Sequence, residues 1–198
     1  HGTTFMYLLP ITKNEALIEY TLFSEKTLKK NEYEIELKKY ISKYLNIENY
    51  KITHKEFGII PMSLAQFERN HKLSKSIINI GTTGGYTKAS SGYTFQFIQK
   101  NSEIIIQNLL KNTRPSPKKN IRDKMFEWYD RTLIEVLISK QMEGRKVFTI
   151  MFQKNSIDKI LSFLGNESSL KDDLKIMTSL PFLPFLKSGI KHLFKNKF

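Results

Sequence analysis

A glycine-rich loop limits the possible folds of this chain more than any other stretch. Residues 81–95 (GTTGGYTKASSGYTF) contain four of the nine glycines. A short apolar run, residues 77–80, precedes the loop, and apolar residues at helical spacing follow it. Glycine lets the backbone adopt positive φ, and a helix that opens after such a loop presents free N–H groups that bind anions. The pattern predicts a buried strand, a turn and a helix, forming either a ligand loop or a tight connection without a ligand.

The same loop also offers side-chain hydroxyl groups to a polar ligand. It contains neither the Gly-Lys-Ser/Thr of a Walker-type phosphate loop nor the Gly-x-Gly-x-x-Gly of a dinucleotide fingerprint. A ligand would therefore be held by backbone N–H groups and by hydroxyls. The hydroxyl candidates are Thr82, Thr83, Thr87, Ser90 and Ser91.

The charge of the chain is strongly basic, with 32 Lys and Arg against 19 Asp and Glu and a net charge of +13. Such a balance fits nucleic acid, an anionic membrane surface, or only a lysine-rich solvated surface. The basic residues are scattered and not interleaved with aromatics on one element, so we expect no nucleic acid partner. The absence of cysteine excludes disulfides, thiolate metal sites and cysteine nucleophiles, and the four histidines are too dispersed to predict a metal site.

Hydrophobic periodicity divides the chain into three segments of an α+β fold. Residues 1–76 predict a sheet portion with one helix, because residues 3–9 and 15–23 form a hairpin pattern and residues 31–45 have helical spacing. Residues 77–112 predict a strand, the glycine-rich loop and a helix. Beyond a proline-containing linker, residues 113–198 predict a helical C-terminal subdomain.

Glu19 is the first candidate for chemistry. On the second predicted strand it shares an apolar row, and the opposite face is apolar as well, which predicts a central strand covered on both sides. Burial penalises the charged form of a carboxyl group, so a carboxyl group in such a row is a candidate proton donor near neutral pH. The alternative is a structural ion pair with a lysine or arginine elsewhere in the sheet.

The last segment, which ends at Phe198, predicts an amphipathic helix with a basic side. Lysines recur at four-residue spacing beside its apolar stripe, a pattern typical of helices on membrane surfaces. The alternative is a terminal helix docked on the core. The stripe consists of Phe182, Leu186, Ile190, Leu193 and Phe194.

Several short segments spread over nearly the whole chain share their order and spacing with one known family. They are FMYLLP (5–10), ALIEYT (16–21), GIIPM (58–62), IGTTGG (80–85), SGYTF (91–95), FL (163–164) and LPFLPF (180–185). Together they resemble the C-terminal portion of the FAD-dependent lycopene cyclases of carotenoid biosynthesis, of the β-cyclase type. The ordered set carries the resemblance, and no single motif does.

The resemblance implies part of a glutathione-reductase-type flavoprotein. In that fold an N-terminal Rossmann unit binds the ADP part of FAD, and a later loop returns to hold the flavin end. We expect the Rossmann unit to lie upstream of His1, outside this chain, and the isolated 198 residues to be inactive. The cofactor-binding residues that the resemblance implies are Gly81, Thr82, Thr83, Gly84, Gly85, Gly92 and Tyr93.

The resemblance also implies a redox-neutral reaction. An acid protonates a linear end of lycopene, the cation closes to a six-membered ring, and loss of a proton gives a β-ionone ring. Glu19 falls on the family's acidic position; reduced FAD is thought to stabilise the cation, and NAD(P)H to keep the flavin reduced. Lycopene is lipid-soluble, so we expect a cytoplasmic enzyme peripheral to the inner face of the membrane. The alternatives are another FAD-dependent oxidoreductase, hydroxylase-like or related to carotenoid desaturases, and a non-enzymatic basic domain on anionic membrane.

Overall fold

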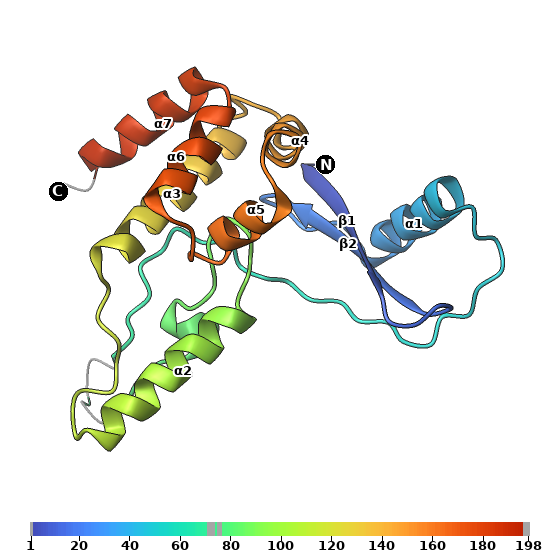
Figure 1. Ribbon diagram of the computed structural model, residues 1–198. Coiled ribbons are helices and arrows are strands. Elements are labelled where there is room, and N and C mark those ends of the chain that lie inside the picture. Colours follow the sequence, from blue (N-terminus) through green and yellow to red (C-terminus); the bar gives the residue numbers. More distant parts are fainter. Residues whose placement is uncertain (1, 71–73, 75–76, 196–198) are drawn as a thin grey trace. The chain divides into compact units, whose positions relative to one another are not determined.

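The computed structural model describes residues 2–70, 74 and 77–195, which fold into seven α-helices and a two-stranded antiparallel sheet (Figure 1). The α+β class predicted from the sequence is therefore confirmed. The chain divides into two compact units. The first is built from the first 58 residues together with residues 143–145, and the second from residues 59–142 and the chain after 145.

The first unit begins with a β-hairpin. Strands β1 (Thr3–Pro10) and β2 (Ala16–Phe23) pair antiparallel along their whole length. The backbone N–H groups of Ile11 and Thr12 donate to the carbonyl oxygen of Glu15, at 2.8 and 3.0 Å, and close the connection. The alternating β-forming residues thus form the hairpin that the sequence predicts.

A layer of aromatic rings joins helix α1 (Lys30–Tyr40) to this hairpin. The Tyr33 ring meets Tyr20 of β2 edge-on at 5.7 Å and Phe57 at 5.5 Å, two contacts typical of aromatic packing. The helix continues as a short π-helix (Ile41–Leu45). Among the described residues from 2 to 58 no side chain is fully buried. The strand β2 is therefore not the central, doubly covered strand that its apolar pattern predicts, because its sheet has only two strands.

Helices form the second unit, as predicted for the C-terminal subdomain. Two apolar clusters make its core, and both include contacts to Leu180. Val136 and Val147 lie at the centre of one, Ile160 and Ile176 at the centre of the other. The helices are α2 (Phe95–Leu110), α3 (Ile121–Ile138), α4 (Gly144–Lys154), α5 (Ile157–Leu164), α6 (Leu170–Ser179) and α7 (Phe182–Lys195).

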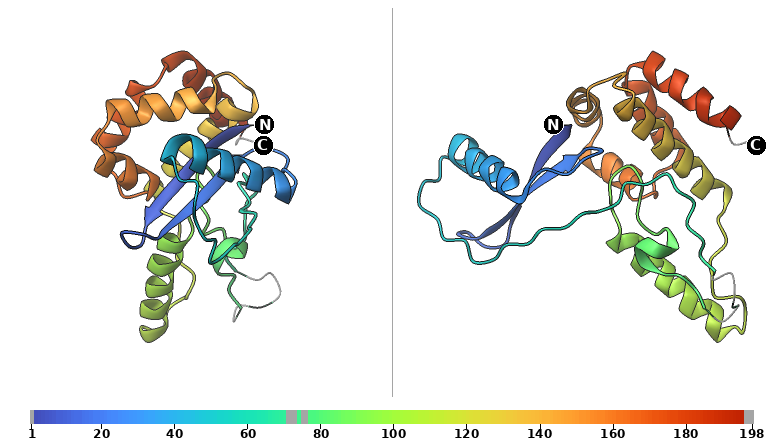
Figure 2. Two further views of the ribbon diagram at one scale, coloured as in Figure 1. Left: turned by 90° about the vertical axis from the view of Figure 1, so that its right-hand side faces the viewer. Right: turned by 180° about the vertical axis from the view of Figure 1, so that it is seen from behind.

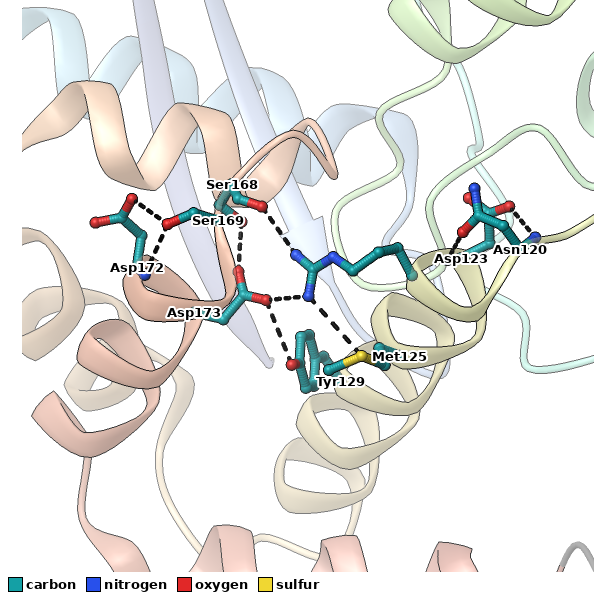
Figure 3. A network of polar contacts seen from close by, with 9 residues as sticks. Asn120, Asp123, Met125, Tyr129, Ser168, Ser169, Asp172 and Asp173 are labelled. Carbon is teal, nitrogen blue, oxygen red and sulfur yellow. Dashed lines mark hydrogen bonds and ion pairs between the residues drawn. The ribbon is translucent and has the colours of Figure 1, made fainter.

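Side-chain caps fix where two of these helices begin. At the start of α3 the Asp123 N–H donates to Asn120 Oδ1 at 2.9 Å, and the Asn120 N–H donates back to Asp123 Oδ2 at 2.8 Å (Figure 3). At the start of α6 the Asp172 N–H donates to the Ser169 hydroxyl at 3.2 Å. Both caps satisfy N–H groups that have no partner inside the helix.

Three helices end in the same way, on a non-glycine residue in the left-handed conformation. Asn112 after α2, Lys140 after α3 and Asn166 after α5 have φ of 51°, 51° and 58°. In each case the N–H of the next residue bonds back to a carbonyl of the last helical turn. Gly144, the next glycine in the sequence, is the first residue of α4.

Residues 77–80 are not the buried strand that their apolar character predicts. The Ile77 and Ile80 side chains are 49% and 61% exposed, and Ile78 forms only an isolated bridge with Asn70. An apolar run becomes a buried strand only where other strands flank it, and the described part of the second unit contains none.

Candidate functional site

Glu19 lies in the middle of β2, directly opposite Tyr7 of β1. Its side chain is half-buried. It is therefore more exposed than the apolar row predicted, but not fully solvated. No ion pair to Glu19 is found among the described residues. The structural ion pair considered for this residue is therefore not observed, and Glu19 shares a face of the hairpin with its cross-strand partner Tyr7.

The first half of the glycine-rich loop is a tight 3₁₀ turn (Gly81–Gly84). The Gly85 N–H donates to the Thr82 carbonyl at 3.0 Å, and the Tyr86 N–H donates to the Gly81 carbonyl at 3.0 Å. Gly81 and Gly85 have φ of 60° and 71°, a conformation that residues with a Cβ rarely adopt. Thr82 and Thr83, between them, are exposed.

The second half of the loop is a turn closed around Lys88. The Lys88 N–H donates to the Tyr93 carbonyl, and the Gly92 N–H donates to the Lys88 carbonyl, both at 2.8 Å. Gly92 has φ of 74°, and a Cβ there would lie 3.0 Å from Ile60 Cγ2. From Gly84 to Gly92 every second residue is buried. This part of the loop is thus packed into the second unit.

Threonine hydroxyls join the two halves of the loop at the start of α2. Thr87 Oγ1 lies 3.1 Å from Thr82 Oγ1 and accepts from the Thr94 hydroxyl at 3.0 Å. Thr94 is the residue that precedes α2, and the first turn of α2 contains no acidic residue. The free N–H groups of this helix end therefore adjoin a group of hydroxyls, an arrangement suited to an electron-rich ligand.

Tyr86 anchors the centre of the loop. Its ring is buried, and the Arg69 guanidinium lies 4.6 Å from the ring centroid. The Arg69 Nη1 group also donates to the Pro117 carbonyl at 3.2 Å. Burial raises the pKa of the Tyr86 hydroxyl, with the charge of Arg69 acting in the opposite direction, so Tyr86 is neutral at physiological pH.

An ion pair that the sequence patterns did not indicate ties the loop to α3. The Lys88 side chain, 2% exposed, places its Nζ 2.7 Å from Asp130 Oδ1. Ser90 donates to the same Oδ1 at 2.6 Å, and Lys88 Nζ donates to Asn166 Oδ1 at 2.7 Å. The sequence predicted the Ser90 hydroxyl as a ligand contact, but it forms a buried hydrogen bond inside the protein. The interpretation of the lysines outside the C-terminal helix as solvated was wrong for Lys88.

A second buried carboxylate, Asp173 of α6, lies in the same core (Figure 3). It accepts from the Ser168 hydroxyl at 2.5 Å, from the Tyr129 hydroxyl at 3.4 Å and from Arg122 Nη1 at 2.7 Å. The bond to Asp173 raises the pKa of Arg122, and burial raises the pKa of Tyr129. The Phe126 ring contacts both cations: the Arg122 guanidinium lies 4.5 Å and the Lys88 ammonium group 5.4 Å from the ring centroid.

Helix α7 packs against α3 (Figure 2). Phe185 of α7 contacts the apolar cluster around Val136 of α3. Ser188, Gly189 and His192 are buried, and the Trp128 Nε1 donates to the Gly189 carbonyl at 3.1 Å. A Cβ at Gly189 would lie 2.8 Å from Trp128 Cζ2. The alternative of a terminal helix docked on the core is therefore correct.

The described part of the α7 stripe is exposed: Phe182, Leu186 and Ile190. Phe182 and Leu183 are 66% and 76% exposed, and Leu186 and Ile190 are exposed as well. The side chains of Leu193 and Phe194, and residues 196–198, lie outside the described residues. None of the described helices is long and apolar enough to cross a bilayer. No group of histidine and carboxylate side chains within the described ranges could hold a metal ion.

Comparison with known proteins identifies the family. A family model described as lycopene cyclase protein matches residues 1–189. The chain belongs to the lycopene cyclase family. Neither the curated proteins nor the solved structures contain a match to the chain. Membership indicates an enzyme of carotenoid cyclisation with a carotenoid substrate.

The candidate residues of this lycopene cyclase fall into two groups. The glycines and hydroxyls that the sequence singled out lie together in one turn-rich segment of the second unit. Glu19 belongs to the first unit. The sequence did not predict a role for Lys88, because its partner Asp130 is 42 positions away and a local pattern cannot indicate so distant a pair.

Replacing Gly92 by alanine tests whether the loop conformation is fixed. The positive φ and the contact with Ile60 should cost about 1–3 kcal/mol of unfolding free energy. Gly58→Ala is the control, because a Cβ there meets nothing within 4 Å, and it should change stability by less than about 0.5 kcal/mol. Urea unfolding followed by circular dichroism measures both. Equal stability of Gly92→Ala and the unaltered protein would contradict a fixed loop.

Proposed function

We propose that the protein is a lycopene β-cyclase, in which this chain supplies the acid and the loop that receives the flavin. The family match over residues 1–189 carries this proposal. The finer assignment rests on two local arrangements: a carboxylate in mid-strand among apolar and aromatic neighbours, and a rigid glycine-rich turn that opens a helix. A glutathione-reductase-type framework would bring such a loop to the flavin.

Glu19 acts as the general acid in this proposal. Its carboxyl O–H gives a proton to a carbon of the terminal double bond of linear lycopene. The electron pair of the neighbouring double bond then forms the new C–C bond of the ring, and loss of a ring proton restores a double bond. Atoms and electrons balance without any net oxidation or reduction. Tyr7, directly opposite Glu19 on the same face of the hairpin, offers an electron-rich ring face to a polyene cation.

The residues of the loop fit the flavin end of FAD. A Cβ at Gly84, Gly85 or Gly92 would meet protein atoms at 3.0 Å or less, so these glycines shape the turn. At Gly81 a Cβ would meet only Ile98 Cδ1, at 3.8 Å, and Thr82 and Thr83 beside it are exposed. Their backbone and hydroxyl groups would hold polar edges of the ring system, and Tyr93 would help to position α2. Reduced FAD, maintained by NAD(P)H, would supply negative charge that stabilises the cation.

Glu19→Gln in the intact protein tests the acid. The amide keeps the shape of the side chain and removes the acidic proton, so β-ring formation in a lycopene-accumulating host should fall about 100-fold or more. Glu15→Gln, an exposed change on the same hairpin, is the matched control and should leave cyclisation unchanged. Bound flavin is measured by absorbance in each variant. Retained cyclisation by a flavin-loaded Glu19→Gln protein would remove Glu19 as the acid.

We further propose that the enzyme works at a membrane surface, peripherally and on the cytoplasmic side. Its substrate is soluble only in lipid, and α7 has the chemistry of a helix that lies in a bilayer interface. Phe182, Leu183, Leu186 and Ile190 are exposed on one side of α7, and Lys187 follows at the edge of this face. The opposite side of the helix is used for docking on α3, so the exposed face is free of that contact.

Phe182→Ser combined with Leu183→Ser tests this surface. Removing two exposed apolar side chains should weaken binding to anionic vesicles by about tenfold or more, since each contributes roughly 1.5–3 kcal/mol when buried in lipid. Leu161→Ser combined with Leu174→Ser, which are also exposed apolar positions, is the matched control. Vesicle flotation at low and high salt measures the binding. Equal loss in both double variants would contradict a membrane face on α7.

A further inference from the structure

Lys88 is buried in a way that lysines rarely are. Its residue is 5% exposed, and its ammonium group meets three partners at once: Asp130, Asn166 and the ring of Phe126. A buried ammonium group is tolerated only when it is paired and hydrogen-bonded. The three partners come from α3 and from the turn after α5, so the glycine-rich loop is anchored by parts of the chain distant in sequence.

Two loop residues converge on one carboxylate of α3. Lys88 Nζ and the Ser90 hydroxyl lie 2.7 and 2.6 Å from the same oxygen, Oδ1 of Asp130. Phe126, which lies under the ammonium group, is four residues before Asp130 and thus on the same face of the helix. One face of α3 therefore forms the surface against which the loop is held.

Backbone hydrogen bonds of Lys88 connect the anchored side chain to the rest of the loop. Its N–H and its carbonyl both bond across the turn, to Tyr93 and Gly92, immediately before α2 begins. The neighbouring Thr87 joins Thr94 and Thr82 through hydroxyl contacts of 3.0 and 3.1 Å. The position of Lys88 is therefore coupled to the 3₁₀ turn on one side and to the start of α2 on the other.

We propose that Lys88 and Asp130 are positioning residues of the flavin loop: their ion pair, joined by Ser90, holds the loop on α3 in the shape that receives the cofactor. This inference rests on the proposed function for its ligand. The helical subdomain is then a part of the cofactor site, although none of its residues needs to touch the flavin.

Amide hydrogen exchange of the loop, read in the intact protein, tests the anchoring without any cofactor. Lys88→Met keeps the length of the side chain and removes its charge, leaving Asp130 buried with one partner fewer. Exchange in residues 84–94 should accelerate by about tenfold or more, because opening of the loop no longer breaks an ion pair. Ser90→Ala removes only one hydrogen bond and should accelerate this exchange by a smaller factor. This variant replaces Lys88→Met in the test if Lys88→Met does not fold.

Arg122→Met is the matched control. Arg122 forms an ion pair of the same length with a buried carboxylate, Asp173, and lies over the same ring of Phe126, but none of its recorded contacts is to the loop. It should lower thermal stability while leaving exchange in residues 84–94 and the Kd for FAD within about twofold. Unchanged loop exchange in both Lys88→Met and Ser90→Ala, or the same acceleration in Arg122→Met, would overturn the proposal.

The affinity for FAD is measured on the same proteins. Lys88→Met should raise the Kd about tenfold relative to the unaltered protein, in line with the larger population of open loops, and an unchanged Kd would overturn the positioning role. If the unaltered intact protein has no affinity for FAD, the proposed function fails, and with it the flavin part of this inference. The exchange result then decides separately whether Lys88 fixes the loop.

Discussion

The carboxylate of Asp130 is the group on which the arrangement of the second unit depends most. It accepts from Lys88 and Ser90, and so determines where a loop rich in glycine lies against α3. Glycine-rich segments have a large conformational freedom to lose on folding, and this loop contains few large apolar side chains that could hold it by burial alone. The ion pair and the hydrogen bond to Asp130 of α3 hold the loop in place of such apolar burial.

The core around Phe126 extends the same principle. Two cations, Lys88 and Arg122, lie against one aromatic ring, and each is paired with a buried carboxylate on a different helix. Removing either partner of such a pair leaves an uncompensated charge and costs about 3–5 kcal/mol. The network therefore joins the loop, α3 and α6 into one body. The exposed apolar side chains of α7 and the exposed threonines after Gly81 are accessible to ligands and surfaces.

Periodicity and turn chemistry predicted most of the local structure. The hairpin and the helices of the C-terminal subdomain follow from patterns spanning only a few residues. Residues 77–80 and the environment of Glu19 did not follow, because burial depends on neighbouring strands that no local pattern records. Lys88 and Asp130 were missed for a related reason: a buried lysine has the same local sequence as a solvated one. The glycines of the loop were recognised, although most of them serve packing rather than access for a ligand.

The central claim, that this loop of a lycopene cyclase receives the flavin, can be tested by photolabelling the intact protein with an azido-flavin analogue of FAD. Mass spectrometry then locates the modified peptide, with excess FAD as competitor. The account predicts that the label lies in the peptide containing residues 81–95 and disappears in the presence of FAD. Labelling elsewhere in the chain, or labelling that FAD does not suppress, would contradict it.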